Sequence, residues 1–287
     1  MKPQLLKISS GPAISFTARQ IDHPYLNSSW HYHPEIELLH VIEGEGTLLV
    51  GDAIMQFKAG DVLLIGAHLP HYWRFYENYI GNNGLPAQVA YVQFCDNFWG
   101  KDFLLLPENN AIKLLLDKAK RGMHIQGDTA TQTIQLLAKL IVSEQTERII
   151  VLLQLLQLLA NSQEYLLLSS VYQEQHFEAI ENERINVVYK YILTHFKNKI
   201  YLHQVAAIAN LTPNSFCRFF KAKTKKSFSL FLIEIRVGYA CKLLLENNLS
   251  IKQICYASGF NSFTNFNKQF KSVTGKLPSI YQKQVAH

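Results

Sequence analysis

A pattern of small, aromatic and basic residues occurs twice near the C-terminus of this 287-residue chain. Residues 205–221 match a second stretch that lies about fifty residues further along the chain. The matched positions are Phe216 with Phe266, Arg218 with Lys268, Phe220 with Phe270, Lys221 with Lys271, and Thr224 with Thr274. The repetition predicts a duplicated structural unit, and it constrains the fold more than any other feature of the sequence.

The second copy predicts two helices joined by a glycine turn. Ser250 is a good N-cap for a short helix over residues 251–258, and Gly259 can end that helix at a positive φ. Ser262 can then cap a second helix over residues 263–274. A short helix, a tight turn and a second helix form a candidate helix-turn-helix unit.

The second helix of this unit is amphipathic. Its apolar face carries Phe263, Phe266 and Phe270, at helical spacing. The other face carries amide, hydroxyl and ammonium groups, which can read base edges or contact phosphates. We expect Thr264, Asn265, Asn267 and Lys268 to read bases and Lys271 to contact phosphate. A single helix of this kind fits an ordinary solvated face equally well, but the duplication favours DNA reading.

The first copy has an equally clear helix start, because Thr212 can act as the N-cap and Pro213 can occupy the first helical position. On its outward face we expect base contacts from Asn214, Ser215, Cys217 and Arg218 and a phosphate contact from Lys221.

Between the two copies, residues 228–247 predict one helix about 30 Å long, at roughly 1.5 Å per residue. That length is close to one turn of B-DNA, about 34 Å. Two reading helices on such a spacer could therefore enter successive major grooves.

Residues from about 184 to 284 resemble the DNA-binding domain of the AraC/XylS family of bacterial transcription regulators. The matching residues are Arg236–Ala240, Leu243, Leu244, Ile251–Ile254, Gly259, Phe260, Phe263, Phe266, Phe270, Lys271, Gly275, Pro278 and Tyr281. The resemblance implies sequence-specific binding to promoter DNA by two helix-turn-helix units, with RNA polymerase as a partner. One departure is Lys225, where the family usually carries a glycine. A lysine there must adopt a left-handed conformation, or the helix must end in another way.

Charge is distributed unevenly along the chain. Residues 183–287 contain 16 Lys and Arg against 3 Asp and Glu, whereas residues 1–182 contain 12 against 19. The basic segment is therefore expected to bind a polyanion such as DNA.

The cysteines and the apolar runs favour a cytoplasmic protein. No pair of cysteines has CxxC or zinc-finger spacing, which predicts free thiols at Cys95, Cys217, Cys241 and Cys255. The N-terminus has no long apolar core typical of a secretion signal. The leucine-rich run over residues 149–160 is too short to span a bilayer, and we expect no membrane association.

The N-terminal half has the texture of a small β-barrel or jelly roll. Short apolar runs are separated by glycine-containing turns, over residues 36–42, 47–50, 53–57, 61–65, 71–76 and 88–95. Residues 1–29 are expected to form an arm with early strands.

Two segments in this half resemble the motifs of cupins. The first is HxHxxxE, formed by His31, His33 and Glu37, and the second runs from Gly60 to His71. His31 and His33 share one strand face, so that with Glu37 and His71 they could hold Zn, Ni, Mn or Fe. The second motif is imperfect, since Gly66 and His68 replace its usual proline and glycine. The alternatives are a metal-free sensor pocket and polar groups that anchor a hairpin.

The second motif also supplies candidate contacts for an effector. An aromatic face with a guanidinium suits a carbohydrate or a small anion, although core packing explains the tryptophan equally well. The candidate ligand-binding residues are His31, His33, Glu37, His71, Trp73 and Arg74.

Helical patterns follow the predicted barrel. We expect helices over residues 108–121, over 129–143 with Asp128 as the cap, and over 147–161 with Thr146 as the cap. The last of these is apolar on nearly every side, which predicts burial against the barrel and against a second subunit of a homodimer. Packing within one chain is the alternative.

The fold class that follows is α+β, with a cupin-like barrel and an all-α double helix-turn-helix domain. The expected divisions are a sensing barrel over 1–106, a helical dimerisation region over 107–168, a linker over 169–182 and a DNA-binding domain over 183–287. The function expected is a non-enzymatic, ligand-responsive transcriptional regulator. Two alternatives are a metal-dependent cupin enzyme, of dioxygenase or isomerase type, fused to a DNA-binding domain, and a constitutive DNA binder with an inert barrel.

Overall fold

The structure is a computed structural model, and it divides into two compact units over residues 3–176 and 177–287. Most of the expected N-terminal arm and the middle of the expected linker lie outside the described residues. The residues described are 4–5, 15–22, 30–76, 79, 85–170 and 179–285.

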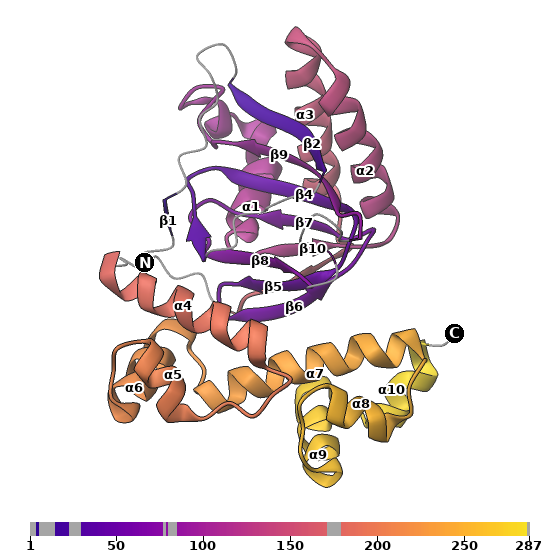
Figure 1. Ribbon diagram of the computed structural model, residues 1–287. Coiled ribbons are helices and arrows are strands. Elements are labelled where there is room, and N and C mark those ends of the chain that lie inside the picture. The colour runs from indigo at the N-terminus through magenta and orange to yellow at the C-terminus, as the bar shows by residue number, and fades with distance from the viewer. Residues whose placement is uncertain are drawn as a thin grey trace. The chain divides into compact units, whose positions relative to one another are not determined.

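The first unit is a β-sandwich made of two sheets (Figure 1). In spatial order, the five-stranded sheet contains β1 (Gln4–Leu5), β3 (His31–Tyr32), β8 (His71–Phe75), β5 (Gly46–Val50) and β6 (Ala53–Phe57). The six-stranded sheet contains β11 (Tyr165–Leu167), β10 (Met123–Ile125), β7 (Val62–Ile65), β4 (Ile36–Glu43), β9 (Gln88–Phe94) and β2 (Phe16–Asp22). All six expected strands are present with ends shifted by at most one residue, because alternating apolar residues and glycine turns are local signals.

The six-stranded sheet separates two hydrophobic cores, because successive strand residues point to opposite faces. Leu39 and Leu63 belong to the core that also contains residues of the five-stranded sheet, such as Leu48 and Trp73. Leu38 and Leu64 belong to the core formed with the helices.

That second core is covered by three helices: α1 (Asn110–Ala119), α2 (Gly127–Val142) and α3 (Gln145–Asn161). Two short 3-10 helices, η2 (Phe103–Leu105) and η3 (Pro107–Asn109), precede α1. Figure 1 shows α2 and α3 side by side, and α2 contacts β2, β7 and β9. The helices are therefore part of the same unit as the sandwich.

Two expected helix caps in this region are wrong. Asp128 lies within the first turn of α2, whose N-cap is Gln126, and Glu144 rather than Thr146 is the N-cap of α3. Glu164 supplies the partner for the first turn of α2, since its Oε2 accepts a hydrogen bond of 2.8 Å from the Thr129 amide. Strands β10 and β11 were also not expected within the helical region. Each has only three residues, and β10 pairs with both β7 and β11.

The second unit is entirely helical in its described residues, 179–285. Its helices are α4 (Ala179–His195), α5 (Leu202–Ile208), α6 (Pro213–Thr224), α7 (Phe228–Glu246), α8 (Ile251–Ala257), α9 (Phe263–Thr274) and α10 (Pro278–Val285). Helix α7 contacts α6, α8, α9 and α10, and Figure 1 shows it linking the two helix-turn-helix units. The predicted long connecting helix is thus confirmed.

The start of each reading helix also follows the sequence prediction. The Thr212 hydroxyl accepts a hydrogen bond from the Ser215 amide at the start of α6, and the Ser262 hydroxyl does the same for Asn265 at the start of α9. Lys225 ends α6 in the left-handed conformation, at φ 58°, where α9 ends at Gly275 with φ 76°.

The two helix ends share the same threonine closure. The Thr224 hydroxyl donates to the Phe220 carbonyl and accepts from the Lys226 amide, and Thr274 makes the equivalent bonds. The lysine at position 225 therefore sits in a turn with the same threonine hydrogen bonds as its glycine counterpart, whose amide also donates to the Lys271 carbonyl.

No helix in the described part of the chain is long and apolar enough to cross a membrane. All four cysteines are free thiols, as expected from their spacing.

Candidate DNA-binding surface and histidine cluster

Helices α6 and α9 present matched polar faces to solvent. Their apolar faces are anchored by four phenylalanines with no exposed surface: Phe216, Phe220, Phe266 and Phe270. The candidate DNA contacts that are exposed are Asn214, Cys217, Arg218, Lys221, Thr264, Asn265, Lys268 and Lys271. Ser215 and Asn267 are half-buried. Phe263 was expected on the buried face, but it lies at the first position of α9 and is 39% exposed.

Some of these polar groups are held by their own helix. The Asn267 side-chain amide donates to the Phe263 carbonyl at 3.1 Å, and the Gln269 amide donates to the Asn265 side-chain oxygen at 3.4 Å. Such bonds orient the asparagine side chains while leaving their remaining polar atoms available for a base edge. Arg218 and Lys268 occupy equivalent exposed positions in the two helices.

Three histidines come together in the sandwich. His31 on β3 pairs with His71 on β8, and His33 follows directly after β3. One ring nitrogen of each lies within 4.8 Å of the other two, and all three side chains are buried. Backbone pairing of distant segments therefore builds a cluster that could hold a metal ion.

Hydrogen bonds to the backbone set the tautomers of two of these rings. The Nδ1 atom of His33 lies 2.8 Å from the Glu35 carbonyl, and that of His71 lies 2.8 Å from the Leu69 carbonyl. Each Nδ1 then carries a proton and donates it, which leaves the lone pair of the neutral His71 ring on Nε2. Among the described residues the His71 Nε2 has no hydrogen-bond partner, whereas the His33 Nε2 lies 3.5 Å from the Glu37 carboxylate. Burial, followed by the charge of His31, holds the pKa of His71 well below its usual range, so the ring is neutral as a metal ligand requires.

Glu37 lies next to this cluster and is not one of its members. Its Oε2 is 3.5 Å from the His33 Nε2 and accepts a hydrogen bond from the Gln93 side chain. Burial acts to raise the pKa of Glu37, but the His33 interaction and the charges of the three histidines lower it to about 2. The expected set of three histidines and a carboxylate is thus three histidines with a neighbouring carboxylate. Gln93 was missed because it meets Glu37 only through the pairing of β4 with β9.

The structure does not bring Trp73 and Arg74 together. Trp73 is 2% exposed and packs edge-on against Phe57, with ring centroids 5.1 Å apart. Arg74 is the next residue of β8, so its side chain leaves the opposite face of the sheet. Of the six candidate ligand-binding residues, the three histidines and Glu37 are therefore adjacent, and the other two are not in one site.

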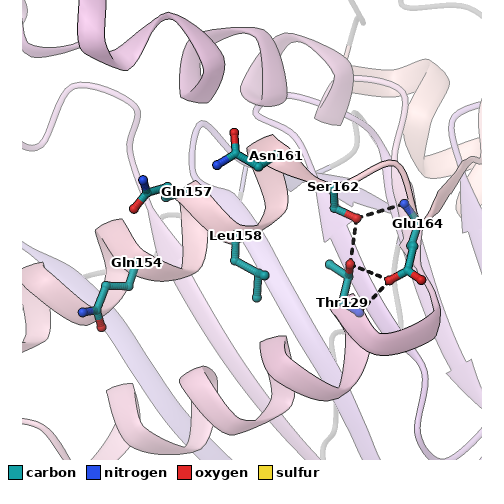
Figure 2. A pocket seen from close by; sticks show the side chains of 7 residues that line it. All are labelled: Thr129, Gln154, Gln157, Leu158, Asn161, Ser162 and Glu164. Atoms are coloured by element: carbon teal, nitrogen blue, oxygen red, sulfur yellow. Dashed lines mark hydrogen bonds between the residues drawn. The ribbon is translucent and has the colours of Figure 1, made fainter.

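A surface cavity of about 520 Å³ lies between α2 and α3 (Figure 2). Its lining residues are Thr129, Gln154, Gln157, Leu158, Asn161, Ser162 and Glu164. Figure 2 shows that three of its polar groups satisfy one another. Glu164 accepts from the amide and hydroxyl of Thr129, and the Thr129 and Ser162 hydroxyls are 2.7 Å apart. These contacts stabilise the helix pair, and they could not be predicted from sequence because Thr129 and Glu164 are 35 positions apart.

Comparison with known proteins matches both units. A helix-turn-helix domain model matches residues 205–284, and a cupin domain model matches residues 21–78. The chain is 24% identical over 268 residues to the uncharacterized HTH-type transcriptional regulator YdeC of Bacillus subtilis, covering 88% of this chain and 85% of that protein. It is 22% identical over 251 residues to the Msm operon regulatory protein of Streptococcus mutans, covering 85% and 83%. The chain combines an AraC-type helix-turn-helix domain with an N-terminal cupin domain, the organisation of an AraC-family transcriptional regulator.

The helical unit is an AraC-type DNA-binding domain, and the first unit contains a cupin domain. These relatives are named as transcriptional regulators and not as enzymes. Among solved structures, the DNA-binding domain of AdpA in complex with a target DNA is 26% identical, covering 34% of this chain and 87% of that chain, with a TM-score of 0.33. ToxT from Vibrio cholerae is 12% identical, covering 96% and 100%, with a TM-score of 0.36.

Proposed function

We propose that this AraC-family regulator senses an effector in its cupin domain and thereby controls promoter binding by two helix-turn-helix units. The observation that carries the proposal is the pair of capped, exposed reading helices, α6 and α9, joined by the single helix α7. In this proposal the base-reading residues are Asn214, Ser215, Cys217, Arg218, Thr264, Asn265, Asn267 and Lys268, and the phosphate contacts are Lys221 and Lys271.

The effector site in this proposal is the cluster of His31, His33 and His71. Three buried imidazoles, with an unpartnered Nε2 on His71 and a carboxylate beside His33, suit a divalent metal ion with open positions for a further ligand. A bound metal would supply a Lewis-acidic point for an effector with oxygen donors. A carbohydrate stacked on Trp73 is less well supported, because that side chain is buried in the core.

The link between sensor and DNA-binding unit begins beside His71. Val50 pairs with His71, and the following Gly51 amide donates to the Pro70 carbonyl at 2.8 Å. The next residue, Asp52, accepts hydrogen bonds from the Ser169 hydroxyl at 2.7 Å and the Ser170 amide at 2.9 Å. Occupancy of the histidine cluster would therefore act, through the turn after β5, on the segment that leads toward α4.

The domain divisions and the assembly are part of the same proposal. The barrel over residues 1–106 senses, the region over 107–168 dimerises, and the segment over 169–182 links them to the DNA-binding domain over 183–287. A homodimer is supported by exposed apolar side chains near the α2–α3 connection: Val142 at 77%, Ile149 at 39% and Ile150 at 50% exposure. A promoter-bound dimer would then contact RNA polymerase.

Selection of binding sites from random DNA by the full-length protein, followed by footprinting, tests the DNA-reading part. We expect two half-sites whose centres are about 10 bp apart, one helical turn. A single uninterrupted site would contradict the proposal.

Metal analysis and titration test the sensing part. Protein dialysed against a chelator should bind about one Zn²⁺ or Co²⁺ per chain, and His71→Gln should weaken that binding by about a hundredfold or more. Metal loading should also change operator affinity. Equal operator affinity with and without metal would show that the metal is not the signal.

A further inference from the structure

We propose that Arg236 and Gly259 form a joint that fixes the distance and orientation between the two helix-turn-helix units, so that they act as positioning residues for bipartite DNA binding. The inference rests on the proposed function, because a fixed separation matters only if α6 and α9 read two half-sites of one operator.

Helix α7 contributes to two separate cores. Its first half places Phe228 and Phe231 against Phe220 of α6, with ring centroids 5.8 and 5.2 Å from that ring. Its second half places Val237 and Ala240 in a core with residues of α8 and α9. A single helix bends and twists along its length, so α7 alone leaves two such cores free to shift against each other.

A second connection between the halves lies at the turn between α8 and α9. Gly259 packs directly on the segment between α4 and α5. A Cβ atom at position 259 would lie 2.5 Å from the Phe196 carbonyl oxygen and 2.9 Å from the Lys197 Cα. Both contacts are with backbone, which cannot move away as the end of a flexible side chain can. The turn of the second helix-turn-helix unit is thus seated on the segment that leads from α4 into the first helix-turn-helix unit.

Arg236 of α7 is hydrogen-bonded to the same segment between α4 and α5. Its Nε donates to the Phe196 carbonyl and its Nη2 donates to the Asn198 carbonyl, each at 2.8 Å. Its guanidinium also lies 5.9 Å from the centre of the Phe260 ring, in the turn between α8 and α9. One side chain therefore contacts both the segment after α4 and the turn before α9.

The first helix-turn-helix unit shows that Gly259 is needed for space and not for its dihedral angle alone. Asn210 fills the left-handed position of the turn between α5 and α6, at φ 53°, so a residue with a Cβ can hold this conformation in the same motif. Gly275, at φ 76°, has no atom within 4 Å of a built Cβ. Gly259, unlike Gly275, carries a close backbone approach from the segment between α4 and α5.

A rigid joint has a consequence for operator choice. Moving one half-site by one base pair shifts it by about 3.4 Å and rotates it by roughly 35° around the duplex. A protein with a fixed separation loses affinity for such a site, whereas one with a loosened joint adapts to it. The joint therefore selects half-site spacing without touching a base.

The test uses the full-length protein and operators derived from the selected site, with native spacing, one base pair added, one removed, and a single half-site. The variants are Arg236→Met, Arg236→Lys and Gly259→Asn, with Gly275→Asn as the matched control. Asparagine tolerates a positive φ, so Gly259→Asn tests the close approach while Gly275→Asn tests the dihedral angle.

We expect the wild type and Gly275→Asn to lose about tenfold in affinity, or about 1.4 kcal/mol, when the spacing changes by one base pair. In Arg236→Met and Gly259→Asn, that discrimination should fall to within about threefold, mostly through weaker binding at native spacing, with half-site affinity unchanged. Arg236→Lys retains one charged donor and should recover part of the discrimination.

Spacing discrimination that survives in both Arg236→Met and Gly259→Asn would overturn the joint. Wild-type indifference to spacing would instead overturn the proposed bipartite function. Circular dichroism melting of each variant accompanies the affinities, and Arg236→Lys decides the matter should Arg236→Met unfold.

Discussion

The histidine cluster and the reading helices are two kinds of site built by different means. The cluster gathers buried side chains from β3, the residue after it and β8, and backbone pairing brings these together. The reading faces come from exposed side chains, each set on one continuous helix. Substitutions at the cluster should therefore act mainly on stability and metal loading, whereas substitutions on α6 and α9 should act mainly on DNA binding.

The largest effect is expected for Glu37→Ala. The change removes a buried carboxylate and leaves the His33 ring and the Gln93 amide without it, which should cost about 3–5 kcal/mol of stability. All three tryptophans, Trp30, Trp73 and Trp99, lie in the cupin unit, so tryptophan fluorescence in a urea titration reports that unit alone. Glu108→Ala at an exposed position is the control and should change stability by no more than about 0.5 kcal/mol. Equal urea midpoints for Glu37→Ala and Glu108→Ala would show that the buried carboxylate contributes no more to stability than an exposed one.

A second, smaller effect is expected for Arg218→Ala, on binding rather than on folding. Loss of a base-reading guanidinium should cost roughly 1–3 kcal/mol of operator affinity and relax the preference at one base position. Lys271→Ala should weaken all sequences alike and reduce the salt dependence of binding. Affinity measured on a panel of single-base operator variants separates the two. Retention of both affinity and preference by Arg218→Ala would remove its reading role.

Lys225→Gly tests one difference between the C-terminal turns of α6 and α9, a lysine in place of a glycine at the left-handed position. The lysine holds φ 58°, a conformation that glycine adopts without strain, so the change should stabilise the DNA-binding unit by up to about 1 kcal/mol. Ala222→Gly, at an exposed position inside α6, is the matched control and should destabilise by about 1 kcal/mol. Thermal melting followed by circular dichroism measures both. A loss of stability in Lys225→Gly would indicate that the lysine makes a compensating contact.

The smallest effect concerns Glu164 and is seen through pH. Hydrogen bonds from the Thr129 side chain and amide lower the pKa of Glu164 below its usual range. A carboxyl group with a lowered folded-state pKa contributes stability above its unfolded pKa and loses it as the pH falls. The melting temperature of the wild type should thus exceed that of Glu164→Gln at pH 7, and the gap should narrow below about pH 4.5. A gap that widens in acid would contradict the assigned role.

Local signals explain which parts of the molecule were predicted from the sequence. Thr212, Ser250 and Ser262 cap helices in the structure as expected, because a cap and its partner lie within three residues. The strands of the sandwich were also found, since their alternation and their glycine turns are contained in short windows. Even the left-handed Lys225 was anticipated as one of two outcomes.

The features that were missed depend on contacts between distant positions. Asp128 was predicted to cap α2, but the first turn of that helix is bonded by Glu164, which follows α3 in the chain and accepts a hydrogen bond from the Thr129 amide. Gln93 beside Glu37 follows from strand register, and the role of Arg236 follows from the fold of α4 against α7. Trp73 and Arg74 were grouped as neighbours in sequence, and strand alternation separates them.

The hydrogen bonds of Asp52 to Ser169 and Ser170 have a practical meaning for protein engineering. They hold residues 169 and 170 to the β5–β6 turn of the cupin unit, so the chain is still anchored to the sensor at Ser170. A chimera that grafts this sensor onto another reading head should therefore be spliced after Ser170. A splice before Ser169 would discard the anchor by which the sensor holds its outgoing chain.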